Sequence, residues 1–188
     1  MRLKIVQTGE PILREPARPL TPKEILSADI QRLIADMRDT MRDAPGVGLA
    51  APQIGLGLQL AVIEDREDLL KSVSADELAD KERTGVAFHV IVNPRITPVG
   101  DEKIEFFEGC LSVAGFMAAV ARARRVRVEC LDENAKPRVI DAAGWYARIL
   151  QHEIDHLNGT LYIDRMHPRS FTTLDNYSRH WRSKPTTK

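Results

Sequence analysis

The pattern of hydrophobic and polar positions along the chain predicts two amphipathic helices. The first spans about residues 29–43, where apolar side chains recur three and four positions apart: Ile30, Leu33, Ile34, Met37 and Met41. The second spans about 142–157, with Asp141 placed to cap its first turn and Asn158-Gly159 placed to end it. Helices with this pattern bury one face, so both are expected to pack against the rest of the fold.

Shorter patterns predict several β-strands. Residues 124–131 alternate most clearly, because Val126, Val128 and Cys130 share one face while charged side chains occupy the other. Four further stretches are strand candidates: 58–64 and 86–92, which are apolar, and 103–107 and 116–120, which are weaker. The segment 65–85 is highly charged and is expected to be a long exposed loop that can include a helical turn. Many strands with two well-separated helices favour an α+β fold.

Composition indicates one globular domain without a general attraction to charged partners. The 188 residues include 27 Lys plus Arg and 27 Asp plus Glu, so the formal net charge is zero and favours neither DNA nor an anionic membrane as a partner. Residues 1–170 are expected to form the domain, and 171–188 a basic tail that belongs to it or extends from it. That tail is expected to be solvated, with contact to ribosomal RNA as the sharper alternative.

Cysteine usage and hydropathy favour a reducing, aqueous compartment. Two cysteines do not form the framework of a secreted disulfide-rich protein, and no apolar stretch approaches the roughly 20 residues of a membrane span. The first residues reach charges and prolines at once, unlike a signal peptide. The expected location is the cytoplasm, or an organelle if a targeting segment has been removed.

The second predicted helix carries the sequence Gln-His-Glu-Ile-Asp-His, with His152 and His156 four residues apart. This spacing puts both imidazoles on one helical face, about 5–6 Å apart at Cβ, where they can share one ion. Glu153 points beside the pair and can act as a general base on an attacking water. Trp145 and Ile149 continue the same stripe, which favours a buried metal site over two solvated histidines.

A catalytic site of this kind needs a third protein ligand. A metzincin would have a third histidine where this chain has Tyr162, and the 29 residues after Gly159 contain no glutamate for a thermolysin-like site. Cys110 is the remaining candidate, and its thiolate with two histidines would leave one coordination position open. Cys130 instead continues the inward face of its strand and is expected to be a core residue.

These residues are also compatible with two other classes of protein. A zinc endopeptidase uses the same helical motif, although the missing third histidine and the missing downstream glutamate speak against it. A non-catalytic domain stabilised by zinc would need a fourth protein ligand nearby. The remaining histidines, His89, His167 and His180, show no ligand spacing to the motif.

Three segments resemble the signature motifs of peptide deformylases: Gly-Val-Gly-Leu-Ala-Ala-Pro-Gln at 46–53, Glu-Gly-Cys-Leu-Ser at 108–112, and Gln-His-Glu-Ile-Asp-His-Leu-Asn-Gly at 151–159. They occur in the family's order, and the resemblance spans about residues 5–170. Residues 144–166 look closer to the subgroup of organelles and some bacteria. The chain departs from many bacterial members at Ala114, where they have proline, and at 171–188, which show no clear C-terminal helix.

The resemblance implies antiparallel β-sheets around a central helix that carries the histidines. It implies a hydrolase that removes the N-formyl group from the N-terminal methionine of nascent polypeptides and releases formate. The implied roles are as follows: metal ligands Cys110, His152 and His156, acid/base Glu153, and oxyanion donors Gln53 and the N–H of Leu111. The implied cofactor is one divalent ion, natively iron(II), and zinc, nickel or cobalt suit the same ligands.

An apolar pocket for the methionine side chain is expected beside the metal. Ile149 and Trp145 lie about one and two turns before His152 on the histidine stripe, while Val47 and Phe106 lie near the other motifs. Each of these four is also a good core residue. In the family, the main chain of Gly48 hydrogen-bonds the substrate, and a residue without a side chain lets a peptide approach closely.

Ligating histidines usually have an acceptor for their second ring nitrogen. Glu108, two residues before Cys110, is a candidate for that role, and Arg122 is a candidate partner of Glu108.

Overall fold

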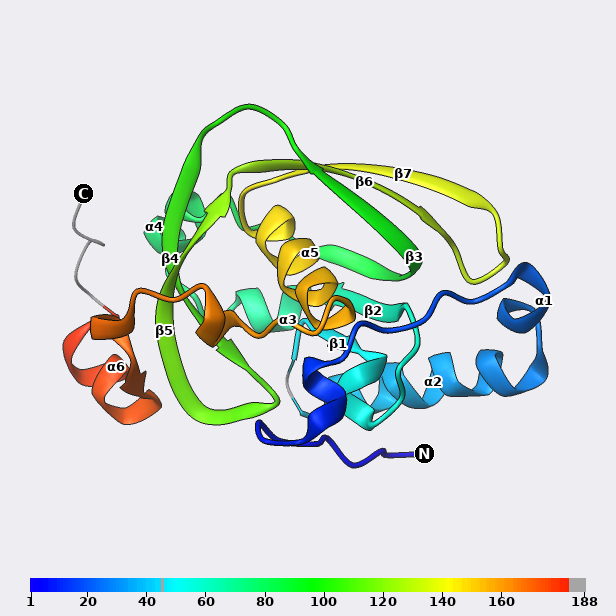
Figure 1. The fold of residues 1–188 in the computed structure, drawn as a ribbon. Helices are drawn as coiled ribbons and strands as arrows, with labels where there is room; N and C mark the ends of the chain where they lie inside the picture. Colours follow the sequence, from blue (N-terminus) through cyan, green and yellow to red (C-terminus); the bar gives the residue numbers. More distant parts are fainter. Residues whose placement is uncertain (45, 183–188) are drawn as a thin grey trace.

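The structure is a computed structural model that describes residues 1–44 and 46–182. Its central element is helix α5 (Gly144–Leu157), which lies between two antiparallel sheets (Figure 1). One sheet has the order β1-β2-β3-β6-β7: β1 (Gly48–Ala50), β2 (Leu60–Asp65), β3 (Val86–Pro98), β6 (Arg125–Leu131) and β7 (Pro137–Ala143). The other has the order β4-β5-β8: β4 (Lys103–Cys110), β5 (Val113–Ala123) and β8 (Thr172–Thr173). The predicted α+β fold around a histidine-bearing helix is confirmed.

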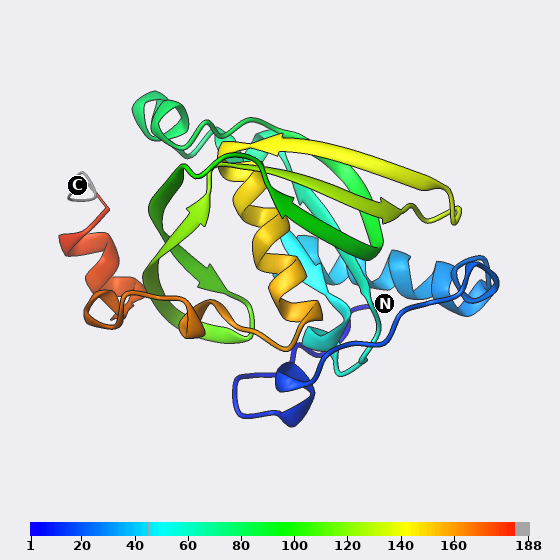
Figure 2. The same ribbon diagram turned by 45° about the horizontal axis from the view of Figure 1, so that its top comes forward.

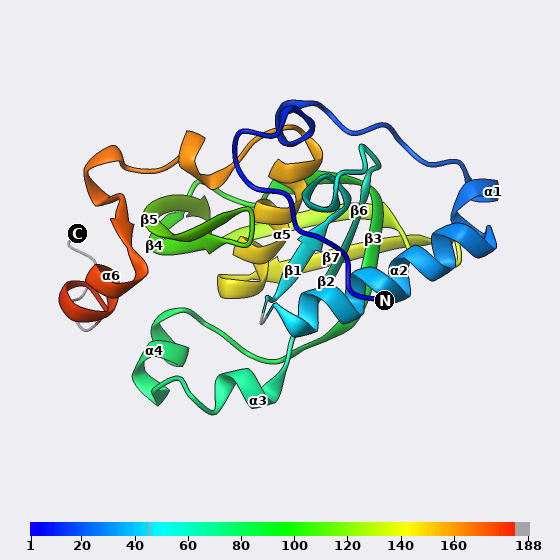
Figure 3. The same cartoon turned by 90° about the horizontal axis from the view of Figure 1, so that it is seen from below.

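Helix α2 (Ala28–Asp43) confirms the first predicted helix. It begins at the cap residue Ser27, whose side chain accepts a hydrogen bond from the N–H of Ile30, and it lies along β1 and β2 (Figure 3). The described residues also form shorter helices: α1 (Pro22–Ile25) before α2, α3 (Glu67–Leu70) and α4 (Ala75–Asp80) between β2 and β3, and α6 (Leu174–His180) after β8. The 3-10 turns lie at Pro11–Arg14, Ala51–Ile54, Tyr162–Asp164 and Pro168–Ser170. None of the helices among the described residues is long and apolar enough to cross a membrane.

The five-stranded sheet is buried on both faces near β2. Ile63 of β2 packs into the core that the sheet forms with α5, while Val62 packs into the core that the sheet forms with α2. All six residues of β2 are buried, which explains why this strand shows an apolar run rather than an alternation. In β6, by contrast, Val126 and Val128 face α5 and their neighbours are exposed, as the sequence predicts. Figure 2 shows α5 against this sheet.

Helix α5 confirms the second predicted helix but starts differently. Its N-cap is Ala143, which makes no side-chain cap, so the expected cap at Asp141 is wrong. Asp141 belongs to β7, where it lies opposite Arg127 of β6 and accepts a 3.0 Å hydrogen bond from its guanidinium. The helix ends at Asn158 as predicted, and Gly159 follows with a φ of 71°, in the left-handed region.

Two segments hold more structure than the sequence pattern predicted. The charged stretch 65–85 contains the short helices α3 and α4, the second capped by Ser74. The C-terminal segment contains β8 and α6, so the expected lack of a helix there is wrong over 174–180. Tyr177 of α6 packs on Phe107 of β4, with ring centroids 4.9 Å apart. Helices this short show little periodicity and depend on such packing. Residues 183–188 of the predicted tail lie outside the described residues.

Candidate metal centre and active site

Three side chains with metal-binding chemistry converge beside α5. His152 and His156 are one helical turn apart, and their ring centroids are 5.0 Å apart. Cys110 comes from the end of β4, where the pairing with β5 shifts at a bulge after Gly109. Its sulfur lies 3.3 Å from Nε2 of His156, and one donor atom from each of the three residues lies within 4.8 Å of the others.

This donor set fits a single divalent cation. Bonds of about 2.0–2.3 Å at tetrahedral angles would separate a bound sulfur from a bound nitrogen by about 3.5 Å, close to the observed spacing of Cys110 and His156. Burial holds the pKa of His156 well below its ordinary range, so its ring is neutral, which is the form that binds a metal. Three protein ligands also leave one position open, as in catalytic sites. The chain therefore carries a Cys/His/His metal-binding triad.

A buried carboxylate on β4 fixes the ring of His152. Nδ1 of His152 lies 3.1 Å from Oε2 of Glu108, which leaves Nε2 as the ligand atom. Glu108 also accepts from Nε and Nη2 of Arg122, both at 2.9 Å, and from Nη1 of Arg148 at 2.6 Å. Burial alone would raise the pKa of Glu108, but the hydrogen bonds from His152 and Arg122 outweigh it and hold that pKa well below its usual range. Both predicted partners of Glu108 are confirmed.

The ion pairs continue on the far side of Arg122. Its Nη1 donates to Asp155 of α5, and Asp155 also accepts from Nε and Nη2 of Arg165 at 2.7 and 2.8 Å. Arg122 is 4% exposed, so its pairs with Glu108 and Asp155 lie inside the protein, whereas Arg165 reaches the surface. Breaking such a buried pair typically costs about 3–5 kcal/mol, because it leaves a charge without its partner. The network therefore anchors the hairpin of β4 and β5 on α5.

Glu153 is a second buried carboxylate, and it lies against the backbone of β1. A methyl group built on Gly48 would be 2.2 Å from Oε1 of Glu153, so only a glycine leaves room for this side chain. Glu153 is 4% exposed, and its Oε2 has no hydrogen-bond partner among the described residues. Burial raises the pKa of Glu153 to about 7. A carboxyl group with these properties can both accept and return a proton near neutral pH.

Gln53 places an amide beside Cys110. It lies in the 3-10 turn Ala51–Ile54, is 2% exposed, and accepts a 2.9 Å hydrogen bond from the N–H of Ala50 on its Oε1. This bond orients the side chain so that Nε2 lies 3.3 Å from Oγ of Ser112 and 3.6 Å from the sulfur of Cys110. The amide therefore presents an N–H donor beside the metal site.

One cavity of about 460 Å³ is lined by these residues among others: Gln53, Glu108, Cys110, His152 and Glu153. Among its walls, Gln53, Ile149 and Glu153 are buried, whereas the exposed lining residues gather on one side: Gly109, Ala114, Gly115, Phe116 and Leu174. The cavity is therefore deep at the metal triad and opens between β5 and the start of α6.

Comparison with known families identifies the chain. The family model described as polypeptide deformylase matches residues 2–171. The chain belongs to the polypeptide deformylase family.

Individual relatives agree with this family. Peptide deformylase 1A, chloroplastic, of Solanum lycopersicum is 49% identical over 172 residues, which make up 92% of this chain and 62% of that protein. The corresponding chloroplastic/mitochondrial protein of Arabidopsis thaliana is 49% identical over 173 residues, 92% of this chain and 64% of that protein. The chain thus spans less than two thirds of these plant relatives. A Met-Ala-Ser-bound peptide deformylase from Acinetobacter baumannii is 31% identical, with a TM-score of 0.78 over 88% of this chain and 99% of that one.

The structure brings most of the residues that were predicted to contact a substrate to this cavity. Val47, Gly48, Trp145 and Ile149 line it, as does Leu111, whose backbone N–H is an expected oxyanion donor. Phe106 is not among the lining residues. Its ring packs edge-on against Trp145, with centroids 6.4 Å apart, so it supports the wall from behind.

The sequence pattern did not indicate several other residues that line the cavity. Arg148 lies beneath Trp145 and also donates to the backbone oxygens of Val120 and Ile104. Its spacing, four residues before His152 on the same helical face, was an available signal. Arg83 reaches the cavity from the segment between α4 and β3, and Leu174 reaches it from α6. Neither position has a local pattern that indicates its place.

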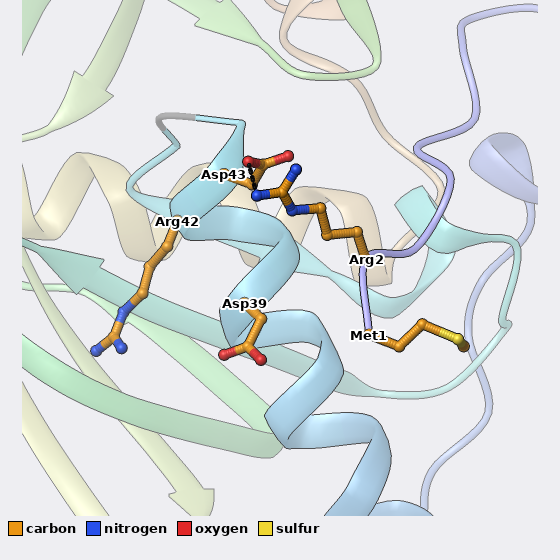
Figure 4. Close-up of a pocket in the computed structure, with 5 residues that line it drawn as sticks. All are labelled: Met1, Arg2, Asp39, Arg42 and Asp43. Carbon is orange, nitrogen blue, oxygen red and sulfur yellow. Dashed lines mark ion pairs between the residues drawn. The ribbon is translucent and has the colours of Figure 1, made fainter.

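A second hollow lies away from this site, between the N-terminus and α2. Its lining residues are shown in Figure 4: Met1, Arg2, Asp39, Arg42 and Asp43. Arg2 pairs with Asp43 at 2.9 Å, while Arg42 donates to Glu64 at 2.7 Å. The five side chains point in different directions in Figure 4, so they do not surround a common point where a ligand would be held.

Proposed function

We propose that this chain is a metal-dependent hydrolase that removes the formyl group from the N-terminal methionine of nascent polypeptides and releases formate. The observation that carries the proposal is the buried carboxylate of Glu153, next in sequence to His152, in the cavity that two residues of the metal triad, Cys110 and His152, also line. A formamide carbonyl is a poor electrophile. Its hydrolysis therefore needs an activated water, stabilisation of the oxyanion and a proton for the leaving amine.

The proposal gives each of these tasks to a group in the cavity. A divalent cation held by the triad would lower the pKa of water and polarise the formyl carbonyl. Glu153 takes the proton of the attacking water and passes it to the leaving α-amine. Gln53 and the N–H of Leu111 donate to the oxygen that gains negative charge, and loss of one such donor typically lowers turnover about 10²–10³-fold. The hydrogen bond from Ala50 that orients Gln53 supports this role.

The walls of the cavity support methionine as the first residue of the substrate. Val47, Trp145 and Ile149 offer apolar surface beside the triad, which suits an unbranched thioether side chain. Gly48 lines the cavity beside Glu153, and in this proposal its main chain hydrogen-bonds the substrate backbone. The Met-Ala-Ser-bound relative from Acinetobacter baumannii supports the same type of ligand for this chain.

We infer that the native metal is iron(II), with zinc, nickel or cobalt able to replace it. A thiolate and two imidazoles suit all four ions, and metal analysis of anaerobically purified protein tests this choice. The expected compartment remains the cytoplasm, or an organelle if a targeting segment has been removed. Contact between the basic C-terminal segment and ribosomal RNA stays a prediction. Arg179→Gln with Arg182→Gln should weaken ribosome co-sedimentation at low salt, and unchanged binding would remove the idea.

The decisive experiment measures formate release from formyl-Met-Ala-Ser by Glu153→Gln. Glutamine has nearly the same shape but cannot accept the proton, so turnover should fall about 10²–10⁴-fold while bound metal stays near the parent value. Glu67→Gln, at an exposed position of α3, serves as the matched control and should keep parent activity. Turnover of Glu153→Gln within a few-fold of the parent would refute the proposed role.

A further inference from the structure

An exposed apolar surface lies at the mouth of the cavity. Phe116 of β5 and Phe171, just before β8, stack with ring centroids 4.9 Å apart and planes 6° apart. The two residues remain 39% and 42% exposed, and Leu174 at the start of α6 is 49% exposed. These three residues are called the aromatic platform below. Large apolar side chains gathered in one exposed place commonly mark a binding surface.

The aromatic platform is held in place by the fold. β8 pairs with β5, so that Thr173 lies opposite Phe116 in the register. Just before β8, Oγ of Ser170 accepts a 2.8 Å hydrogen bond from the N–H of Ala119 and donates to the carbonyl of His167 at 2.6 Å. Because these bonds fix the segment on β5, a ligand would not have to order the platform when it binds.

We propose that the aromatic platform binds an apolar side chain in the part of the formylated polypeptide that follows its methionine. This proposal rests on the proposed function above. Phe116 and Leu174 line the same cavity as Glu153, and they belong to its exposed side, whereas Glu153 is buried. A chain whose formyl end is at Glu153 must leave through the mouth, and the mouth is bordered by the platform. The family model ends at residue 171, so Leu174 and α6 lie beyond the matched part of this chain.

The polypeptide substrate suits this surface better than a small molecule does. Its backbone continues out of the cavity in an extended form, advancing about 3.3 Å per residue, so successive side chains pass the rim. A leucine that covers part of two phenyl rings removes apolar surface from water on both partners. We expect it to raise kcat/KM roughly fivefold to tenfold over serine at the same position.

The test uses metal-loaded enzyme and formyl-Met-Ala pentapeptides in which one leucine replaces serine at position three, four or five. The measured quantity is the ratio of kcat/KM for the leucine peptide to that for the all-serine peptide. The parent should show a ratio of about five to ten at one position, and Phe171→Ser and Leu174→Ser should each lower it toward one. Phe171→Tyr keeps the ring and should preserve the ratio. Leu26→Ser removes an equally exposed residue, 58% exposed beside α1, and should leave it unchanged.

The ratio separates this proposal from the proposed function. Lack of turnover on every peptide would count against deformylation itself, because the platform affects only the relative rates. Turnover with a ratio near one at all three positions would overturn the platform proposal. A second result would also overturn the platform proposal: a ratio near one, together with a parent dimer in sedimentation that Phe171→Ser dissociates. In that case a second copy of the chain would occupy the platform. An equal ratio in the parent and in both serine variants would overturn it as well.

Discussion

Gly48→Ala tests the arrangement of the active site with the smallest change to the chain. A Cβ at this position would lie 2.2 Å from Oε1, 2.5 Å from Cδ and 2.8 Å from Cγ of Glu153. Real Cβ contacts essentially never fall below 3.0 Å, so one partner must move by about 1 Å. The backbone of Gly48 is held in β1 by pairing with Ile63 of β2. The carboxylate of Glu153 is therefore the group that must move.

The expected losses of turnover and stability in Gly48→Ala follow from how little room the side chain of Glu153 has. Its side chain is buried on α5, which itself packs on β1, so the carboxylate cannot turn toward solvent without disturbing that contact. Displacement of a reacting group by about 1 Å can lower turnover about 10²-fold. Overpacking at a well-filled site typically costs about 1–3 kcal/mol of folding stability. We therefore expect Gly48→Ala to fold with a lowered melting temperature, bind metal and lose about two orders of magnitude in kcat.

The assay compares formate release, bound metal and urea unfolding in Gly48→Ala and in Gly57→Ala. At Gly57 the nearest atom to a new Cβ is Cδ1 of Ile12 at 3.4 Å, so this control should keep parent activity. The double variant Gly48→Ala/Glu153→Gln separates displacement of the carboxylate from a blocked substrate. If Gly48 acts through Glu153, the alanine should have little further effect on the glutamine variant. Activity of Gly48→Ala within threefold of the parent, or full additivity in the double variant, would refute the reasoning.

Three further predictions concern the metal, the buried ion pairs and pH. Cys110→Ser should lose affinity for soft divalent ions, whereas Cys130→Ser, 7% exposed in the core beside α5, should bind metal normally and unfold at lower temperature. Arg148→Met should lower the free energy of unfolding by about 3–5 kcal/mol in urea titrations, because it leaves the buried carboxylate of Glu108 short of a donor, and Arg148→Lys should recover only part of this loss. Burial lowers the pKa of His89 from 6.5, so protonation favours the unfolded chain; stability should be full above pH 6.5 and decline as the pH falls below it, and His89→Gln should flatten that decline. A slope equal to that of the parent would show that another group titrates.

The sequence predicted best those helices and strands in which buried apolar positions recur at a regular spacing because one face packs on a single core. Helix α2 and strand β6 were placed well, because each has buried positions that recur at a single period. β1 has only three residues and therefore no period that a pattern could show. Asp141 failed as a cap because the pairing of β7 with β6 holds it in a strand, and this pairing is not visible from the residues near the helix.

The sequence could predict those parts of the site whose residues lie within one turn of the same helix. The four-residue spacing of His152 and His156 and the position of Glu153 follow from one turn of helix, so the sequence was sufficient for them. Cys110 lies 42 positions before His152, so no local spacing indicates it; it was found by excluding the other ligands and by the motif around it. The importance of Arg148 depends on Glu108, its partner on β4, and that contact exists only after the hairpin of β4 and β5 has docked. The aromatic platform also needs the packing of two segments that lie far apart in the chain.

Helix α5 explains why assembly of the metal site and folding of the domain are linked. It buries four polar side chains, Arg148, Glu153, Asp155 and His156, and half-buries a fifth, His152. Burying these groups against an apolar sheet alone would be prohibitively unfavourable. The hairpin of β4 and β5 supplies the partners that make the burial tolerable, since Glu108 faces His152 and Arg122 faces Asp155. The same hairpin ends in Cys110, so the contacts that neutralise the helix also complete the donor set. A cation bound to this donor set adds its binding free energy to the stability of the folded arrangement, in which the ion pairs already hold the hairpin on α5.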